Sequence, residues 1–182
     1  MRKIKLDLAV SLDMMIEGPN GEIDWCIMDS DMNFEDFIDS IDTILFGRVS
    51  YELYKAFETE HMYDAEISKQ FNELNQKKHI VFSNTYKTND SNVVVSSNIL
   101  NTIKELKDTP GKDIWLYGGS VIVSEMLKLN LIDELRLSIH PIILGQGKPL
   151  FHPSDVRKLF HLVEVIRFRS GVIQVIYQKK EA

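Results

Sequence analysis

The chain has 182 residues, of which 44% are hydrophobic and 26% are charged, and this fits a single globular domain, residues 1–182, with a substantial core. Its formal net charge of -6 and its pI of about 5.4, without a basic stripe, argue against a nucleic-acid partner. The single cysteine, Cys26, excludes an internal disulfide and makes a zinc cluster implausible, so we expect no metal site. No long apolar run suggests a signal peptide or a membrane span. We therefore expect a cytoplasmic protein.

Alternating strands and helices are predicted for the first two thirds of the chain. Residues 3–12 alternate between apolar and polar side chains, which predicts a strand, and a long loop follows. Residues 18–21 of this loop are rich in turn formers, whereas Met14, Met15 and Ile16 are apolar and favour a functional loop over a bare connection. The apolar spacing then predicts helix 31–41, strand 43–46, helix 49–57, helix 64–78, strand 79–82, strand 93–95, helix 99–107, strand 114–117 and helix 121–128.

Two of the predicted strands pass into a helix through glycine. Gly118 and Gly119 follow one strand, and Gly47 follows another with Arg48 beside it. Free backbone N–H groups at a helix N-terminus favour an anion, and the missing Cβ atoms let a phosphate approach closely. The sequence therefore favours two phosphate-binding junctions. A tight turn without a ligand, and an ion pair between Arg48 and Glu52, are the alternatives.

The pattern changes after residue 128. Residues 133–144 predict a long strand, residues 145–149 a loop, and residues 158–169 and 172–179 a hairpin around Ser170-Gly171. Crossovers between strands and helices followed by a hairpin predict the α/β class, with a mostly parallel central sheet and an antiparallel C-terminal hairpin. Right-handed crossovers would assemble these elements into a three-layer α/β/α sandwich.

An ordered series of short motifs runs through nearly the whole chain and resembles a known family. The series consists of Ser11-Leu12-Asp13, Gly18-Pro19-Asn20-Gly21, Asp24-Trp25, Phe46-Gly47-Arg48-Val49-Ser50-Tyr51-Glu52, Trp115-Leu116-Tyr117-Gly118-Gly119, Leu131-Ile132-Asp133-Glu134-Leu135 and Pro141 through Leu144-Gly145-Gln146-Gly147 to Leu150-Phe151. It resembles the reductase domain of the bifunctional riboflavin-biosynthesis deaminase/reductase, within the dihydrofolate reductase-like superfamily. The resemblance implies a dihydrofolate reductase-like sheet, NADPH as hydride donor, and frequently a homodimer.

The resemblance also implies roles for the residues at the glycine junctions. Arg48 would bind the 2′-phosphate of NADPH, because a guanidinium can bond two oxygens at once. Ser83, at the end of the third strand, would lie at the adenosine end, and the loop after the first strand would bring Ile16 and Gly18 near the nicotinamide. The implied cofactor-binding residues are Ile16, Gly18, Gly47, Arg48, Val49, Ser50, Ser83, Gly118, Gly119, Ser120, Val121 and Ile122.

Three residues of the first loop are the candidates for contact with the substrate. Trp25 would wall the substrate pocket, with plain core packing as an equal alternative. Asp13 follows the first strand and is our candidate for a catalytic or orienting carboxylate, with a turn-setting role as the alternative. Folate reductases carry a carboxylate five residues after the loop tryptophan, whereas Asp29 and Asp31 stand four and six residues after Trp25. Asp29 is therefore our third candidate, but out of the folate register.

The sequence departs from its relatives in two further ways. Met14 stands where the riboflavin-type pattern Ser-x-Asp-Gly has glycine, and the deaminase motif, His-x-Glu with a later Pro-Cys-x-x-Cys, is absent. Our first hypothesis is an NADPH-dependent reductase of a small heterocyclic substrate, resembling 5-amino-6-(5-phosphoribosylamino)uracil reductase or dihydrofolate reductase. The second is a non-catalytic NADP(H)-binding dimer that acts as a sensor.

Overall fold

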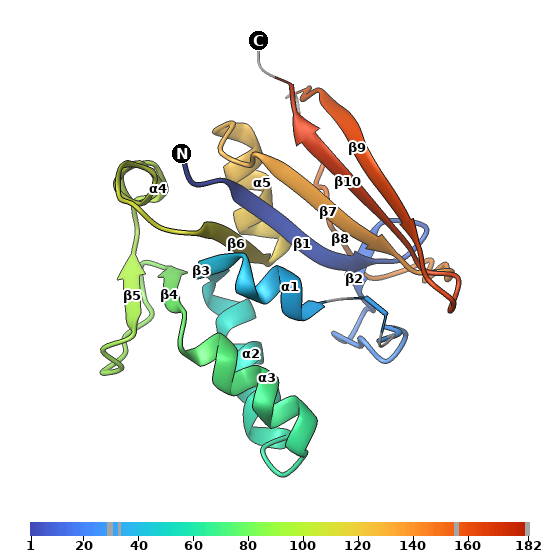
Figure 1. Ribbon diagram of the computed structural model, residues 1–182, viewed down its shortest axis with the longest axis horizontal. Coiled ribbons are helices and arrows are strands. Elements are labelled where there is room, and N and C mark those ends of the chain that lie inside the picture. Colours follow the sequence, from blue (N-terminus) through green and yellow to red (C-terminus); the bar gives the residue numbers. More distant parts are fainter. Residues whose placement is uncertain (29–30, 33, 155–156, 181–182) are drawn as a thin grey trace.

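A computed structural model describes residues 1–28, 31–32, 34–154 and 157–180 of the chain. It contains helices on both sides of a large twisted sheet (Figure 1). The helices are α1 (Phe34–Asp39), α2 (Arg48–Glu60), α3 (Ala65–Asn75), α4 (Ile99–Asp108) and α5 (Ser120–Lys128). The strands are β1 (Ile4–Val10), β2 (Met15–Glu17), β3 (Ile41–Gly47), β4 (Lys78–Phe82), β5 (Val93–Ser96), β6 (Asp113–Gly118), β7 (Glu134–Ile139), β8 (Lys148–Pro149), β9 (Phe160–Arg167) and β10 (Ile173–Lys179). None of the described helices has the length and apolar character needed to cross a membrane.

The central sheet has eight strands in the order β5-β4-β3-β6-β1-β7-β10-β9. The first six of these strands pair in parallel, and β10 and β9 add to the edge in antiparallel fashion. Each parallel connection carries a helix or a long crossover, as parallel pairing requires. The predicted mostly parallel sheet with an antiparallel C-terminal hairpin is confirmed.

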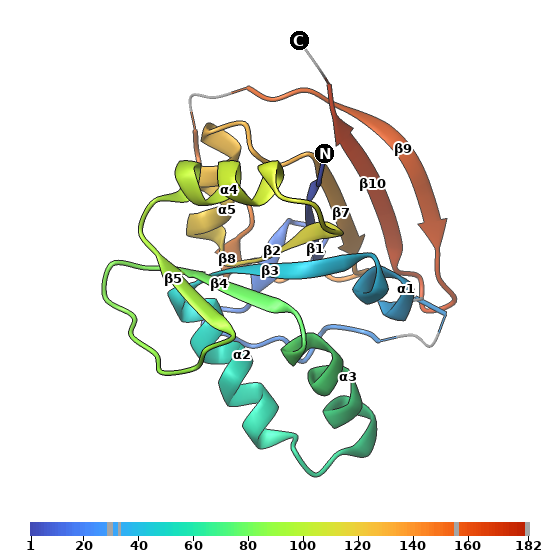
Figure 2. The same ribbon diagram turned by 60° about the vertical axis from the view of Figure 1, so that its left-hand side comes forward.

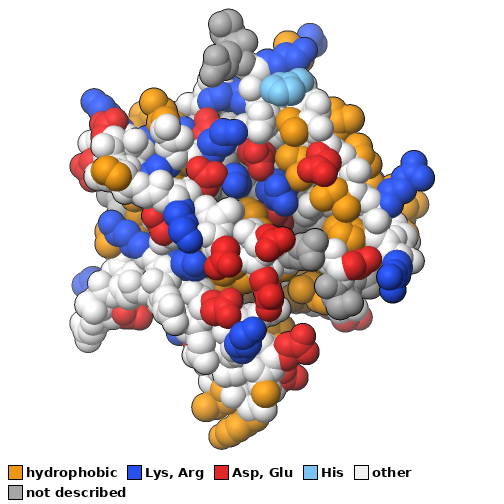
Figure 3. Space-filling model, in the orientation of Figure 1, with side chains coloured by type: hydrophobic (Ala, Val, Ile, Leu, Met, Phe, Trp, Pro, Cys, Tyr) orange, Lys and Arg blue, Asp and Glu red, His pale blue; other side chains and the backbone are white. Residues whose placement is uncertain are grey.

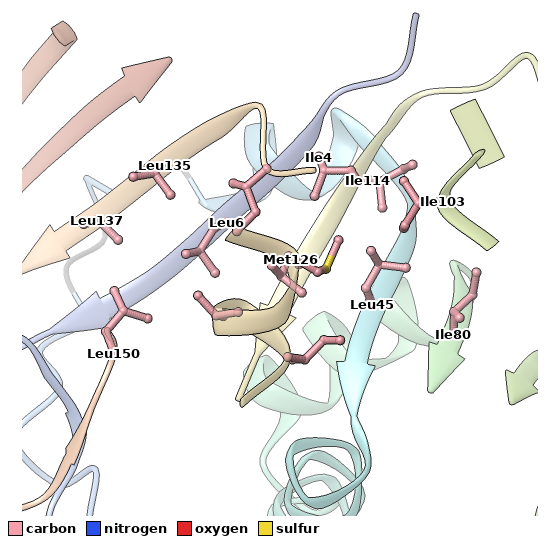
Figure 4. Close-up of a cluster of buried hydrophobic side chains, with 14 of the residues drawn as sticks. Ile4, Leu6, Leu45, Ile80, Ile103, Ile114, Met126, Leu135, Leu137 and Leu150 are labelled. Atoms are coloured by element: carbon pink, nitrogen blue, oxygen red, sulfur yellow. The ribbon is translucent and has the colours of Figure 1, made fainter. Parts of the chain in front are cut away.

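Helices cover the two faces of the sheet with different cores. On one face, α4 and α5 pack on an aliphatic cluster that includes Ile4, Leu6, Leu45, Ile114 and Met126 (Figure 4). On the other face, α1, α2 and α3 cover a more aromatic cluster that contains Phe37, Phe46, Tyr51, Tyr54 and Trp115 (Figure 2). Strands β3 and β6 are buried on both faces, which explains their nearly continuous apolar runs. The predicted three-layer α/β/α sandwich is confirmed.

The structure corrects several predicted boundaries. Helix α1 begins at Phe34, whereas the sequence placed a helix over residues 31–41, and Ile41 already belongs to β3. Strand β7 ends at Ile139, five residues before the predicted end of strand 133–144. The predicted loop at 145–149 contains β8, which pairs with β2 in the first loop. This pair joins segments about 130 residues apart, so local periodicity could not reveal it.

Candidate functional site

The two glycine junctions lie against each other at the carboxyl ends of neighbouring strands. Gly47 of β3 pairs with Phe82 of β4, and Phe46 pairs with Gly118 of β6. A Cβ atom added to Gly47 would lie 3.8 Å from the Gly118 carbonyl oxygen, and one added to Gly119 would lie 2.8 Å from Ser50 Oγ. The structure therefore brings both predicted junctions together on one edge of the sheet, the edge where open α/β sheets bind ligands.

The corner after β6 requires glycine for conformational reasons. Gly118 has a φ of 125° and Gly119 a φ of 26°, both in the region that side chains disfavour. Gly119 is also the residue before helix α5, and Gly47 occupies the same position before α2. Glycine has no side chain that could cap a helix. The first N–H groups of α2 and α5 therefore receive no hydrogen bond acceptor from the side chain at the N-cap position. Two helix N-termini, each with partial positive charge, thus face the same edge.

Arg48 lies at this edge in an exposed ion pair. Its Nη1 atom is 2.8 Å from Glu52 Oε2 and 2.9 Å from Glu52 Oε1, and the two side chains are 44% and 45% exposed. The alternative predicted from the sequence is therefore present in the structure. An exposed pair of this kind contributes only about 0–1 kcal/mol, so a phosphate can displace Glu52 at little expense. The 2′-phosphate role of Arg48 stays a prediction.

Five of the other predicted cofactor-binding residues lie at the same junctions, namely Val49, Ser50, Ser120, Val121 and Ile122. Ser120 and Ile122 are buried in the first turn of α5, whereas Val49 and Val121 are exposed at the starts of α2 and α5. Ser83 follows β4 and its Oγ accepts hydrogen bonds from the amides of residues 85 and 86, at 3.0 and 2.9 Å. Ser83 therefore shapes the turn at the tip of β4, beside the strand that carries Gly47.

The sheet ladder changes beside this corner. Strand β1 pairs with β6 only as far as Leu6 and Leu116, but continues along β7 to the pair of Val10 and Ile139. Beyond Leu6, β1 and β6 are no longer held together by backbone hydrogen bonds. A Cβ atom added to Gly118 would lie 4.0 Å from the Leu8 side chain, which lines this separation. At this point the Trp115 indole of β6 donates to the Asp7 carbonyl oxygen at 2.9 Å, in place of a backbone hydrogen bond between the two strands.

The first loop is fixed to the segment that follows β7. Ile16 lies in β2 and packs against the aliphatic core, and Gly18, the residue after β2, is buried. A Cβ atom added to Gly147 would lie 2.2 Å from the Glu17 carbonyl oxygen, so the two backbones touch. The structure thus places Ile16 and Gly18 in a short, tightly packed β2–β8 pair. Their contact with a nicotinamide stays a prediction.

Asp13 ties the exit of β1 to the same segment. Its carboxylate accepts hydrogen bonds from Ser11 Oγ at 2.6 Å, Gly145 N at 2.8 Å and Leu144 N at 3.1 Å. The Ser11 hydroxyl, followed by the Gly145 amide, lowers the pKa of Asp13 below its ordinary value. Asp13 is therefore an ionised acceptor at neutral pH, suited to positioning the loop and unsuited to donating a proton.

Removing the Asp13 carboxylate should release this loop. In Asp13→Ala, we expect the Gly145 amide to exchange its hydrogen roughly tenfold faster, because its acceptor is gone. Amide hydrogen exchange followed by NMR measures this change. Asp24→Ala, an exposed carboxylate in the same loop, is the matched control. Unchanged protection of Gly145 would show that Asp13 does not hold the loop.

Trp25 packs the rest of the loop against the end of β7. Its Nε1 donates to the Glu22 carbonyl at 3.2 Å, and its ring meets the His140 ring edge-on at 5.3 Å between centroids. His140 is buried, and its Nδ1 accepts from Ile27 N at 3.2 Å. Trp25 is half-buried, so packing accounts for part of its environment and part of its surface stays exposed. The third predicted substrate residue, Asp29, lies outside the described residues.

Cys26 has no features of a reactive thiol. Burial, with a smaller effect from Asp24, raises the pKa of the Cys26 thiol to about 11, so the thiolate is scarce at neutral pH. Within the described part of the chain, no three His, Cys, Asp or Glu side chains are arranged to hold a metal ion.

A polar group that was not predicted from the sequence lies on the face of the sheet that carries α1. Asp7, Glu134 and Gln174 are buried at 7%, 5% and 7% exposure, and Arg136 lies among them. Their strands alternate, so one face supplies the aliphatic core and the other supplies these residues. The polar members of the alternation at residues 5–9 and 134–138 are the sequence signal for this group. The alternation does not show that β1 and β7 pair, so it does not bring Asp7 beside Arg136.

Comparisons with known proteins identify the family and the fold of the chain. The family model of the RibD C-terminal domain matches residues 2–174. The uncharacterized protein YyaP of Bacillus subtilis (strain 168) is 48% identical over 178 residues, which is 97% of this chain and 94% of YyaP. A putative riboflavin biosynthesis protein from Shewanella sp. PV-4 superimposes with a TM-score of 0.81 at 24% identity, and the match covers 100% of both chains.

A larger protein from Thermotoga maritima contains the same fold. This diaminohydroxyphosphoribosylaminopyrimidine deaminase/5-amino-6-(5-phosphoribosylamino)uracil reductase superimposes with a TM-score of 0.67 at 15% identity, over 98% of this chain and 57% of that one. The chain therefore shares the dihydrofolate reductase-like fold of these neighbours. With the family model matching nearly the whole sequence, the chain belongs to the RibD C-terminal domain family.

Proposed function

We propose that this protein is an NADPH-dependent reductase of a small heterocyclic substrate. The observation that carries the proposal is the contact between the two glycine junctions, which points the N-termini of α2 and α5 at one edge of the sheet. A dinucleotide has a pyrophosphate and, in NADPH, a further phosphate, which such paired junctions suit. The Thermotoga neighbour is named as a reductase of 5-amino-6-(5-phosphoribosylamino)uracil, which supports a pyrimidine-like substrate.

Each residue group has a distinct task in this proposal. The backbone amides of Gly118, Gly119 and Ser120 donate to the pyrophosphate, and Arg48 with Ser50 holds the 2′-phosphate. Ser83 lies toward the adenosine end. NADPH, when bound, supplies a hydride, and the chain supplies orientation and the exclusion of water.

The first loop closes the other end of the proposed site. Asp13 positions the loop, Ile16 and Gly18 pass beside the nicotinamide, and Trp25 offers its exposed side to the substrate. We further propose that the reductase works as a cytoplasmic homodimer, as the family resemblance implies.

Cofactor preference tests the proposal directly. NADPH should bind at least about tenfold more tightly than NADH, because Arg48 would bind the 2′-phosphate of NADPH and NADH has no 2′-phosphate. In Arg48→Ala, NADPH affinity should fall by about ten- to a hundredfold while NADH affinity stays unchanged. Titration with each dinucleotide, followed by nicotinamide fluorescence, gives both constants. Lys55→Ala, a cation further along α2 that pairs with Glu58, is the control. Equal binding of the two dinucleotides would remove Arg48 from this role.

A non-catalytic NADP(H) sensor is the second candidate. It is favoured by the observation that the carboxylate of Asp13 is already occupied by three donors. Steady-state NADPH oxidation against a panel of pteridines and aminopyrimidines separates the two candidates. Tight NADPH binding without turnover of any compound would support the sensor.

A further inference from the structure

The buried Asp7 forms an ion pair with the half-buried Arg136, and the tasks above do not use this pair. They are direct register partners on β1 and β7, and Arg136 Nε donates to Asp7 Oδ2 at 2.8 Å. The two side chains are 9% and 22% exposed. Within the described residues, Arg136 Nε is the single donor that the structure gives to the Asp7 carboxylate. An ionised carboxylate can accept several hydrogen bonds, so this one has unused capacity.

Asp7 lies on β1, the neighbour of the strand that ends at the proposed pyrophosphate corner. Asp7 is the first residue of β1 beyond its last pair with β6. The Asp7 carbonyl oxygen accepts a hydrogen bond from Trp115 Nε1 at 2.9 Å. The Trp115 side chain of β6 therefore still contacts β1 where the backbones of the two strands no longer pair. Gly118 follows Trp115 by three residues, or about 10 Å along a strand. A ring that enters between β1 and β6 from the phosphate junctions would therefore approach Asp7.

The guanidinium of Arg136 is incompletely bonded on its outer side. Its Nη1 and Nη2 atoms lie 3.5 Å from Glu134 Oε1 and Gln174 Oε1, at the limit of a hydrogen bond. Its carbon lies 5.4 Å from the centroid of the Phe37 ring. Figure 3 shows charged side chains of both signs gathered near the middle of this face. An incoming acceptor could replace these long contacts with shorter ones.

Aromatic rings border the pair. Phe34, Phe37 and Trp115 contact one another with centroids 5.4 to 5.8 Å apart, and two of the three contacts are edge-on. Phe37 and Trp115 are each 5% exposed and Phe34 is half-buried, so a flat ring would meet this group at Phe34. The surroundings therefore combine an acceptor, a donor and an apolar border, which is the composition of a small-molecule site.

We propose that Asp7 and Arg136 recognise the lactam edge of the substrate, with Asp7 accepting from a ring N–H and Arg136 donating to the adjacent carbonyl oxygen. The inference rests on the proposed reductase function and specifies the substrate as a planar nitrogen heterocycle with that edge. The carboxylate that recognises the substrate would then be Asp7 on β1. Asp29 and Asp31 stand four and six residues after Trp25, and folate reductases carry their carboxylate five residues after this tryptophan. Burial also raises the pKa of Asp7 to about 6 despite the lowering effect of Arg136, as expected for a carboxylate short of donors.

Calorimetric titration with pterin and N3-methylpterin tests this pairing. The full chain, saturated with NADPH, should bind pterin at least tenfold more tightly than N3-methylpterin, which lacks the ring N–H. Asp7→Asn should weaken pterin binding by about ten- to a hundredfold, with the NADPH affinity unchanged. Glu164→Gln, an exposed carboxylate on β9, is the matched control and should bind pterin as the wild type does.

Asp7→Asn leaves Arg136 without its charged partner and could fold poorly. A second variant therefore tests the pairing independently. Arg136→Lys keeps a cation beside Asp7 but loses the two-nitrogen fork, and it should show a similar loss of pterin affinity. The proposal is overturned if both variants bind pterin like the wild type, or if N3-methylpterin binds equally well. Binding of NADPH without any binding of pterin would overturn it and leave the reductase proposal standing. Failure of the wild type to bind NADPH would overturn both.

Discussion

Gly119→Val is expected to lower the affinity for NADPH by at least about a hundredfold, because the substitution moves the backbone amides that form the proposed pyrophosphate site. Gly119 has φ 26° and ψ 155°, a conformation that a β-branched residue adopts only with strain. The new Cβ would also lie 2.8 Å from Ser50 Oγ, on the opposite junction. Relief of either conflict moves the first N–H groups of α5 away from their present direction. The same strain should destabilise the fold by about 1–3 kcal/mol.

The matched control for this variant is Gly171→Val. Gly171 also has a positive φ, of 92°, but lies in the turn between β9 and β10, three strands away from β6 in the sheet. It should lose stability without losing NADPH affinity. Fluorescence titration measures affinity, and thermal unfolding without ligand measures stability. If Gly119→Val retained wild-type affinity for NADPH, the corner after β6 would not be the pyrophosphate site.

The glycine junctions could be predicted from the sequence because their cause is local. Two short apolar runs stop at glycine and resume with helical spacing, and parallel strands bring their carboxyl ends to one edge whatever the order of the strands. The order itself was not needed to expect Gly47 and Gly118 on the same side. Their direct contact depends on β3 and β6 being neighbours, which the sequence did not specify.

The β2–β8 pair and the Asp7–Arg136 pair could not be predicted because their causes are tertiary. Met15 pairs with Pro149 only after β1 and β7 have aligned their ends, and a three-residue strand has no recognisable period. Asp7 stands in a strand whose apolar face was evident from the sequence. The burial of its other face comes from α1 and from the register with β7.

The free energy of unfolding should fall as pH rises from about 4 to about 6 because of Asp7. Burial raises its folded pKa from 3.8 to about 6, against the opposing effect of Arg136, so the folded state binds the proton more tightly than the unfolded state. The stabilising contribution is complete below pH 4, where both states are protonated, and is lost as pH passes the folded value. A rise of this size corresponds to about 3 kcal/mol.

Asp7→Asn cannot titrate, so the difference in unfolding free energy between wild type and variant isolates this contribution. That difference should shift by about 3 kcal/mol between pH 4 and pH 7, with the wild type losing stability relative to the variant. Urea unfolding at several pH values measures it, and Glu164→Gln should follow the wild type. The charged groups that face Asp7 are Lys5 of β1 and Glu134 and Arg136 of β7, and all three are present in both proteins. Parallel curves for wild type and Asp7→Asn would mean that the fold already satisfies the Asp7 carboxylate, which would also leave it no capacity for a substrate.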